Sequence, residues 1–263
     1  MIVRALTGTT NGDTAEIVTQ IDHAVVSGLL AEAWGSPSVS ALVPRDSVVL
    51  AAHMHDIGWR HWESKPRLNT ETGRPTHFLD VAIKEHLRLY RLGLAQVEAL
   101  DLYAGMLVSM HVAGIYTGRF GTQPSMKLTA ASDAQQMVDA FVAEQKAHFS
   151  ALRNALGVTE DELWRNYMLL QVFDRLSLRL CQGDPAGPGP VEIQLPDEAV
   201  LRVELADDGA ETLSPWPFTT PTMTLEIPTR VIALDGYVDD AALGAALASA
   251  AVDLRPVTLR PAV

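Results

Sequence analysis

Cysteine is nearly absent from this chain, because Cys181 is its single cysteine in 263 residues. One cysteine cannot form an intrachain disulfide, which fits a reducing, cytoplasmic setting. It also excludes a metal site built from several thiolates. Any metal site in this chain must therefore use histidine and carboxylate ligands.

Positive charge is scarce as well. The chain has 20 Lys and Arg against 32 Asp and Glu, which gives a formal net charge of −12. Nucleic acids and anionic membrane surfaces bind clustered Lys and Arg, so this balance argues against both as partners. It does not exclude a local basic pocket. We therefore expect a small anionic substrate as the partner, and the sequence leaves a homodimer open.

Hydrophobic runs long enough to span a bilayer are also missing. Residues 241–252 are too few and too rich in alanine for that role, and residues 1–8 lack the long apolar core of a signal peptide. The chain has no Gly-rich nucleotide loop and no Gly-x-Ser-x-Gly motif. Apolar residues still make up 48% of the chain, which is enough for a globular core and too many for disorder.

The chain changes character at a Pro- and Gly-rich segment, residues 183–190, which no helix can cross. Before it, apolar residues recur at helical spacing, and after it they alternate as in strands. We predict an α+β fold in two parts. Residues 1–182 should form a mainly helical metal-binding domain with a small N-terminal hairpin. Residues 183–263 should form a mostly antiparallel, β-rich appendage that packs on that domain.

The predicted elements follow from these patterns. A hairpin should join residues 2–6 and 16–19 across Asn11-Gly12-Asp13, because Asn-Gly is a strong turn signal. Helices are expected at 21–34, 45–57, 79–92, 97–111, 131–156 and 160–181, with a long loop at 58–76. A capping box of Thr159 and Glu162 should begin the last of these helices. Strands are expected at 191–195, 200–205, 223–228, 229–234 and 257–260, with one helix at 239–251 capped by Asp239.

Histidine and aspartate are placed as metal ligands would be. His55 and Asp56 are adjacent at the end of a predicted helix, where an imidazole and a carboxylate can approach one ion from its flank. His23 begins the first helix. Asp174 lies in an apolar helix, where a carboxylate without a partner would be very costly to bury. Asp56 is the best candidate for a carboxylate that bridges two ions.

For several residues near these candidate ligands, the sequence allows two different roles. His77 is a rival to His86 as a ligand, since it also begins a helix. His53 should point away from the face of His55 and belong to the core or support the site. Trp59, Arg60 and Trp62 follow the His-Asp motif and could rim a cavity, although the tryptophans could equally be core residues. Arg175, next to Asp174, could orient that ligand or bind an anion.

The order His23, His55-Asp56, His86, His111, Asp174 resembles the signature of the HD-domain superfamily of metal-dependent enzymes, over roughly residues 20–182. The resemblance implies an HD-type helical bundle. It also implies that His23, His55, Asp56 and Asp174 hold one ion, and that His86 and His111 with Asp56 hold a second. Imidazole and carboxylate donors favour Fe or Mn as these ions.

More narrowly, the chain is similar to the uncharacterised DUF3891 family. The similarity lies in residues 20–24 (QIDHA), in Ser109-Met110-His111 with Tyr116, and in residues 215–218 (PWPF). Two features depart from catalytic HD proteins. Trp59 stands where many carry a lysine, and residues 114–117 (GIYT) lack the proline of the Gly-Tyr-Pro motif of cyclic-dinucleotide phosphodiesterases.

We hypothesise a binuclear metal-dependent hydrolase of a small phosphate-type ester. A metal-bridged hydroxide would be the nucleophile, and the catalytic residues would be Asp56, Arg60 and Arg175. An alternative with the same ligands is a mixed-valence diiron oxygenase that cleaves a C–C or C–P bond of a small polar acid with O2. A second alternative is a non-catalytic, metal-stabilised binding module.

Overall fold

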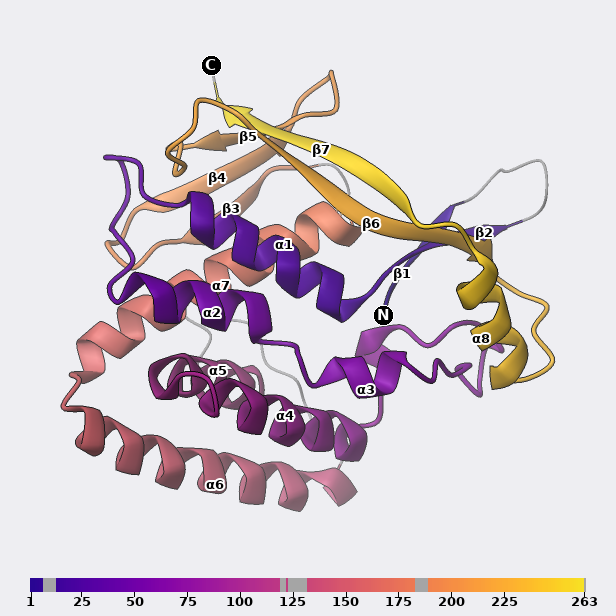
Figure 1. Ribbon diagram of the computed structural model, residues 1–263, viewed down its shortest axis with the longest axis horizontal. Helices are drawn as coiled ribbons and strands as arrows, with labels where there is room; N and C mark the ends of the chain where they lie inside the picture. Colours follow the sequence, from indigo (N-terminus) through magenta and orange to yellow (C-terminus); the bar gives the residue numbers. More distant parts are fainter. Residues whose placement is uncertain (7–12, 119–121, 123–131, 183–188, 263) are drawn as a thin grey trace.

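The computed structural model describes residues 1–6, 13–118, 122, 132–182 and 189–262. In it, a mixed sheet lies along one side of the molecule and layers of helices lie beneath it (Figure 1). The strands are β1 (Ile2–Leu6), β2 (Thr14–Val18), β3 (Val191–Gln194), β4 (Val200–Leu205), β5 (Glu211–Ser214), β6 (Met223–Ala233) and β7 (Asp253–Pro261). The helices are α1 (Gln20–Ala33), α2 (Arg45–Met54), α3 (Trp59–Glu63), the 3-10 helix η1 (Phe78–Asp80), α4 (Ile83–Glu98), α5 (Leu102–Thr117), α6 (Ser132–Leu156), α7 (Glu160–Gln182) and α8 (Asp240–Ser249).

A single seven-stranded sheet has the order β1-β2-β6-β7-β5-β4-β3. Neighbouring strands are antiparallel except β5 and β7, which are parallel. The long strand β6 joins the two ends of the chain, since residues 223–229 pair with β7 and residues 230–233 pair with β2. Pro228, which has no N–H to donate, lies beside this change of partner.

The expected fold class is wrong in its main feature. We predicted a mainly helical HD-type bundle with a separate N-terminal hairpin and a C-terminal β region. Instead, the hairpin strands β1 and β2 and the C-terminal strands form one continuous mixed sheet, so the fold is α+β with a large sheet as its frame. The two predicted parts, 1–182 and 183–263, therefore share this sheet, and the division into domains stays a prediction.

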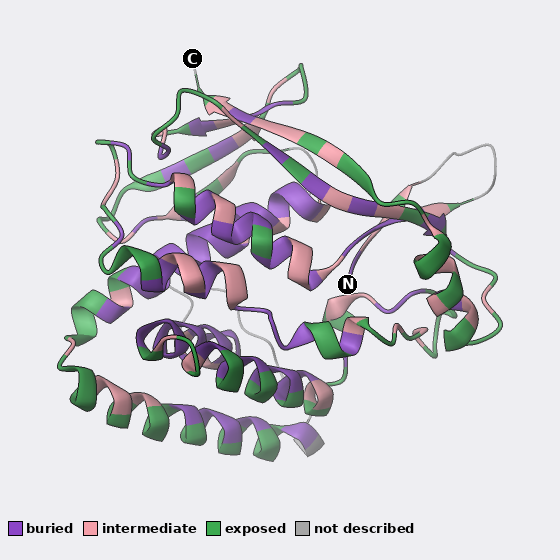
Figure 2. Cartoon of the chain, in the orientation of Figure 1, coloured by how far each residue is buried: buried purple, intermediate pink, exposed green. Residues whose placement is uncertain are grey.

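Most of the helices are stacked against one face of the sheet, whereas α8 packs through Leu243 in a separate small cluster with Ile232 and Leu234. The α1 and α7 helices lie directly beneath it, α2 and α5 follow, and α4 and α6 are farther out (Figure 1). The side chains between sheet and helices form one large hydrophobic cluster, with Trp34, Phe173 and Phe218 at its centre. Burial alternates along residues 224–229 of β6, as it does on a sheet with one covered face, and the phase changes beyond them, where Ile232 is buried in the cluster of α8. The buried faces of the helices point inward (Figure 2).

Local signals account for many helix ends. Thr159 and Glu162 form the predicted capping box, and Asp239 caps α8 as expected. The α4 and α5 boundaries differ from our prediction by several residues, because Asp101 caps α5 and Gly118, at φ 69°, ends it. The Asn11-Gly12 turn lies outside the described residues, as do residues 183–188 of the Pro- and Gly-rich segment. The loop predicted at 58–76 contains α3.

The turn that carries His55 and Asp56 is held close to α4. A Cβ atom on Gly58 would lie 2.0 Å from the Leu89 carbonyl oxygen, and one on Gly93 would lie 3.0 Å from the Gly58 nitrogen. Only glycine allows this approach of two backbones. The approach fixes the position of the His-Asp turn between α2 and α4. None of the described helices has the length and hydropathy that crossing a membrane would require.

Candidate metal centre

Five separate segments bring the predicted ligands together in the interior. His23 lies on α1, whose N-terminus is capped by the Thr19 side chain. His55 is the C-cap residue of α2, and Asp56 follows it in the turn. His86, His111 and Asp174 lie on α4, α5 and α7 and complete the set. All six side chains are buried.

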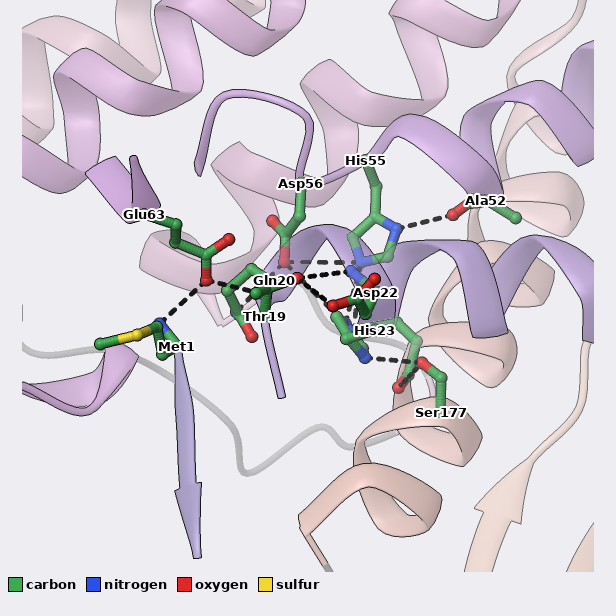
Figure 3. A network of polar contacts seen from close by, with 11 residues as sticks. Met1, Thr19, Gln20, Asp22, His23, Ala52, His55, Asp56, Glu63 and Ser177 are labelled. Atoms are coloured by element: carbon green, nitrogen blue, oxygen red, sulfur yellow. Dashed lines mark hydrogen bonds and ion pairs between the residues drawn. The ribbon is translucent and has the colours of Figure 1, made fainter. Parts of the chain in front are cut away.

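Three ligand atoms meet closely at His23, His55 and Asp174. The Nε2 atoms of the two imidazoles are 3.2 Å apart (Figure 3). Asp174 Oδ1 is 3.1 Å from His23 Nε2 and 3.5 Å from His55 Nε2. Ligands that are each about 2.1 Å from one ion are about 3.0–3.4 Å from one another in octahedral or tetrahedral geometry. The three atoms are therefore spaced as they would be around a single metal ion.

Hydrogen bonds on the outer side of each ring fix which nitrogen faces this point. His55 Nδ1 is 2.9 Å from the Ala52 carbonyl oxygen, to which it can only donate. Ser177 Oγ donates its proton to the Asp174 carbonyl, so it accepts from His23 Nδ1 at 2.9 Å. Neutral rings in these tautomers direct both Nε2 lone pairs toward the Asp174 carboxylate. Three electron-pair donors that converge in this way need a cation between them.

A second group of ligand atoms lies beside the first. His55, Asp56 and His111 offer atoms that all lie within 4.8 Å of one another. Asp56 Oδ2 is 3.7 Å from His55 Nε2 and 3.9 Å from His23 Nε2, and it accepts a hydrogen bond from Gln20 Nε2 at 3.3 Å. Asp56 Oδ1 is buried and has no hydrogen-bond partner in the described part of the chain. A buried carboxylate oxygen without a partner is what a bridging ligand would present to a second ion.

His86 belongs to the same cavity but stands apart from both groups. Its Nδ1 is 2.6 Å from the Tyr116 hydroxyl, and its ring packs against Tyr90 and Trp59. Burial lowers the pKa of His86 to about 4, so the ring is neutral at physiological pH, as a metal ligand must be. Its donor atoms lie in neither close group, whereas His111 lies in the second one.

Charge is strongly coupled in the cluster. Burial lowers the pKa of His55, but the Asp56 charge and the hydrogen bond to Asp174 outweigh it and raise that pKa to about 9. Burial also acts against ionisation of Asp174, but its close contacts with His23 and His55, together with positive charge on the neighbouring imidazoles, hold its pKa well below the usual range. Burial lowers the pKa of His111. In the absence of metal, a proton on His55 therefore supplies the positive charge that the cluster needs, and a metal ion would compete with it.

A small cavity of about 170 Å³ opens onto the cluster. Polar groups on its wall come from Gln20, Tyr90 and all the candidate ligands except His55. Most of the remaining wall is apolar, formed by Phe78, Leu79, Val81, Ile83, Ile115 and Leu178. No Lys or Arg is found among the described residues that line it. Its volume is below the range of about 300–1,000 Å³ that is usual for drug-sized ligands, so a substrate must be small.

The two arginines that we predicted as catalytic lie elsewhere. Arg60 is exposed on α3. Arg175 donates to the backbone carbonyls of Thr122 and Glu192, and burial lowers its pKa. Neither lines the cavity in the described structure. Both therefore remain predictions without a contact to the candidate ligands.

The structure also shows where the remaining candidate residues lie relative to the cavity. His77 caps η1 by accepting from the Leu79 N–H and does not line the cavity, whereas His86 does. His53 points away from the site, as expected, and pairs with Glu32 at 2.8 Å. Trp59 and Trp62 are buried in a small apolar cluster, which fits the core reading of these residues.

Sequence reasoning missed the residues that support the ligands. Gln20 precedes His23 by one helical turn, and Ser177 follows Asp174 by one turn, so helical spacing could have identified both. The Gln20 backbone N–H donates to Glu63 Oε1 at 2.7 Å, which ties the start of α1 to α3 (Figure 3). The Met1 amino nitrogen lies 3.1 Å from the same Glu63 oxygen. No local pattern marked Glu63 as a partner of Gln20.

Comparison with known proteins identifies the family of the chain, but no activity is assigned to that family. Residues 1–233 match DUF3891, which is described as a protein of unknown function. No curated protein and no solved structure matches the chain significantly. The matched region contains every residue of the candidate metal centre and extends through β6, so it includes strands from both ends of the chain.

Proposed function

The chain belongs to the DUF3891 family of unknown function, and we propose from its site that it is a metal-dependent hydrolase of a small phosphate-type ester. The observation that carries the proposal is the convergence of His23 Nε2, His55 Nε2 and Asp174 Oδ1 at 3.1–3.5 Å from one another. The order of the ligands along the chain also resembles the HD-domain superfamily. Their convergence supports our proposal of that relationship.

In this proposal two divalent ions occupy the centre, with Fe or Mn as the metals that suit the donors. The first would be held by His23, His55, Asp56 and Asp174. The second would share Asp56 and be held by His111, with His86 as a further ligand. When bound, such ions lower the pKa of a water molecule toward neutrality and neutralise charge on a phosphoryl group.

The side chains of this chain supply orientation and exclusion of water. The Gln20 amide donates from Nε2 to Asp56 Oδ2, and Gln20 Oε1 is buried and has no hydrogen-bond partner among the described residues. Gln20 also lines the cavity. Gln20 Oε1 can therefore accept a hydrogen bond from a substrate hydroxyl or from a water molecule. The apolar wall beyond it strengthens electrostatic interactions inside the cavity because it excludes bulk water. A small ester with a compact apolar group fits this combination.

The test is to measure metal content and activity on the same sample. Protein grown with added Fe or Mn should contain up to two ions per chain and release phosphate from small phosphate monoesters or diesters. Asp56→Asn should lose both metal and phosphate release. The exposed Asp161 provides a matched control, because Asp161→Asn should retain both. A metal-loaded protein that releases no phosphate but consumes O2 with a small polar acid would replace the hydrolase with the oxygenase.

A further inference from the structure

A second and larger cavity, of about 370 Å³, lies between α5 and α6 and is closed at one end by the start of α7. On α5 its wall is the stripe Met110, Ala113, Gly114 and Thr117, with Ser109 beside it. On α6 its wall is the stripe Lys146, Phe149, Ser150 and Arg153, with Gln145 beside it. Spacings of three, four and seven residues place each stripe on one helix face. The two faces therefore oppose each other across a hollow.

This cavity is separate from the metal centre. His111 follows Met110 directly on α5, and successive residues on a helix diverge by about 100°, so it projects from a different flank. No described residue lines both cavities. Small side chains at Ala113 and Gly114 leave the space that larger residues would fill in a close-packed bundle. The volume falls within the usual range for small-molecule sites, about 300–1,000 Å³.

The inner wall of the cavity carries the Gln145 side-chain amide. Ser109 Oγ donates to Gln145 Oε1 at 2.8 Å, and this bond fixes the orientation of the Gln145 amide. Gln145 is only 5% exposed as a residue, and it lines the cavity with its amide, of which Oε1 is the atom that accepts from Ser109. The Nε2 amino group of the same amide carries two N–H donors, and at the wall of a cavity these can donate to a ligand oxygen or to a water molecule.

The mouth of the cavity carries positive charge. Lys146 is exposed there and makes no ion pair with any described residue. Arg153 is partly buried and pairs with the exposed Glu160 at 3.2 Å. Phe149 and Tyr167 add aromatic surface to the wall, and burial increases from the exposed Lys146 through Phe149 to Gln145. The wall thus changes from cationic to aromatic to hydrogen-bond donating along its depth.

We propose that the cavity between α5 and α6 is a second ligand site that binds a small aromatic carboxylate with a hydroxyl or carbonyl oxygen at its far end. The carboxylate lies at Lys146, the ring packs on Phe149, and the distal oxygen accepts from Gln145 Nε2. The three features of the wall select the three parts of this ligand. The site does not depend on the metal centre or on the hydrolase proposal.

The experiment uses 4-hydroxyphenylacetate as the probe, in titrations of the full-length protein followed by calorimetry and NMR. Phenylacetate lacks the distal oxygen and 4-hydroxyphenylacetamide lacks the charge, so both should bind more weakly than the probe. Lys146→Ala should weaken binding of the probe up to about fivefold, as expected for an exposed charge pair. The exposed Lys65 provides the matched control, and Lys65→Ala should have no effect.

Two further variants locate the binding. Gln145→Met should weaken binding of the probe by about tenfold but leave phenylacetate binding unchanged, because only the probe carries an acceptor. Ala113→Leu should fill the cavity and abolish binding, while circular dichroism reports an intact fold. Asp56→Asn should bind the probe normally, which separates this site from the metal centre. Undetected binding at millimolar probe, or binding that survives Ala113→Leu in a folded protein, would overturn the proposal.

Discussion

Replacing Asp174 by asparagine should weaken binding of the first ion at the metal centre without unfolding the protein. Asparagine has the same shape as aspartate, so packing on α7 is preserved and only the charge and one strong ligand are removed. Asp174 Oδ1 lies 3.1 Å from His23 Nε2 and 3.5 Å from His55 Nε2, so it contributes to the closest group of donors in the described structure. Its loss should leave the two imidazoles and Asp56, which would hold the ion more weakly.

The size of the effect can be estimated from known metal sites. Four ligands of a structural zinc site together supply about 10–16 kcal/mol, which is about 2.5–4 kcal/mol for each ligand. That range corresponds to about a 60- to 700-fold increase in the dissociation constant. The amide oxygen of the introduced asparagine is a weaker ligand rather than an absent one, so we expect a result toward the lower end, about 100-fold.

The assay is competition for metal between the protein and a chelator of known affinity, with ions counted by elemental analysis. Thermal unfolding of the metal-free proteins shows whether the variant folds. Asp161→Asn, on the exposed first turn of the same helix, is the control and should bind metal as the parent chain does. A folded Asp174→Asn protein with parental metal affinity would refute the assignment of Asp174 as a ligand.

Three further outcomes follow from the same site. Gln20→Leu removes the donor to Asp56 Oδ2 at 3.3 Å and should weaken metal binding by about 10- to 100-fold in chelator competition; parental affinity would contradict the positioning role of Gln20. Tyr116→Phe removes the partner of His86 Nδ1 and should weaken only the second ion, by about 10- to 100-fold. Equal loss of both ions would contradict separate roles. His55, with its pKa raised to about 9, should stabilise the metal-free fold below pH 6.5. That contribution, on the order of 3 kcal/mol, should be lost as the pH rises through 9, and denaturant unfolding at several pH values checks it. A metal-free stability that does not change between pH 6.5 and 9 would contradict the charge assignment.

The elements of this fold were more predictable than their assembly. Period-two alternation identified strands in the C-terminal part, the Asn-Gly turn signal identified the N-terminal hairpin, and caps at Thr159 and Asp239 identified helix starts. The error lay in the pairing of β2 with β6, which joins residues more than 200 positions apart. Nothing local specifies such a partner, because a strand with one buried face can pair with any strand of matching pattern. We therefore predicted the hairpin as a separate unit, although it forms one edge of the large sheet.

The candidate site shows which sequence neighbours are neighbours in space. We chose Arg175 because it is adjacent to Asp174, but adjacent side chains on a helix diverge by about 100°. Its guanidinium accordingly bonds to the backbone at Thr122 and Glu192 rather than to any ligand. Ser177, one turn after Asp174, shares its face and fixes the tautomer of His23. For residues on helices, a spacing of three or four therefore predicts which side chains share a site better than adjacency does. His55 and Asp56 are adjacent and still face the same cluster, because α2 ends at Met54 and Asp56 lies in the turn beyond it.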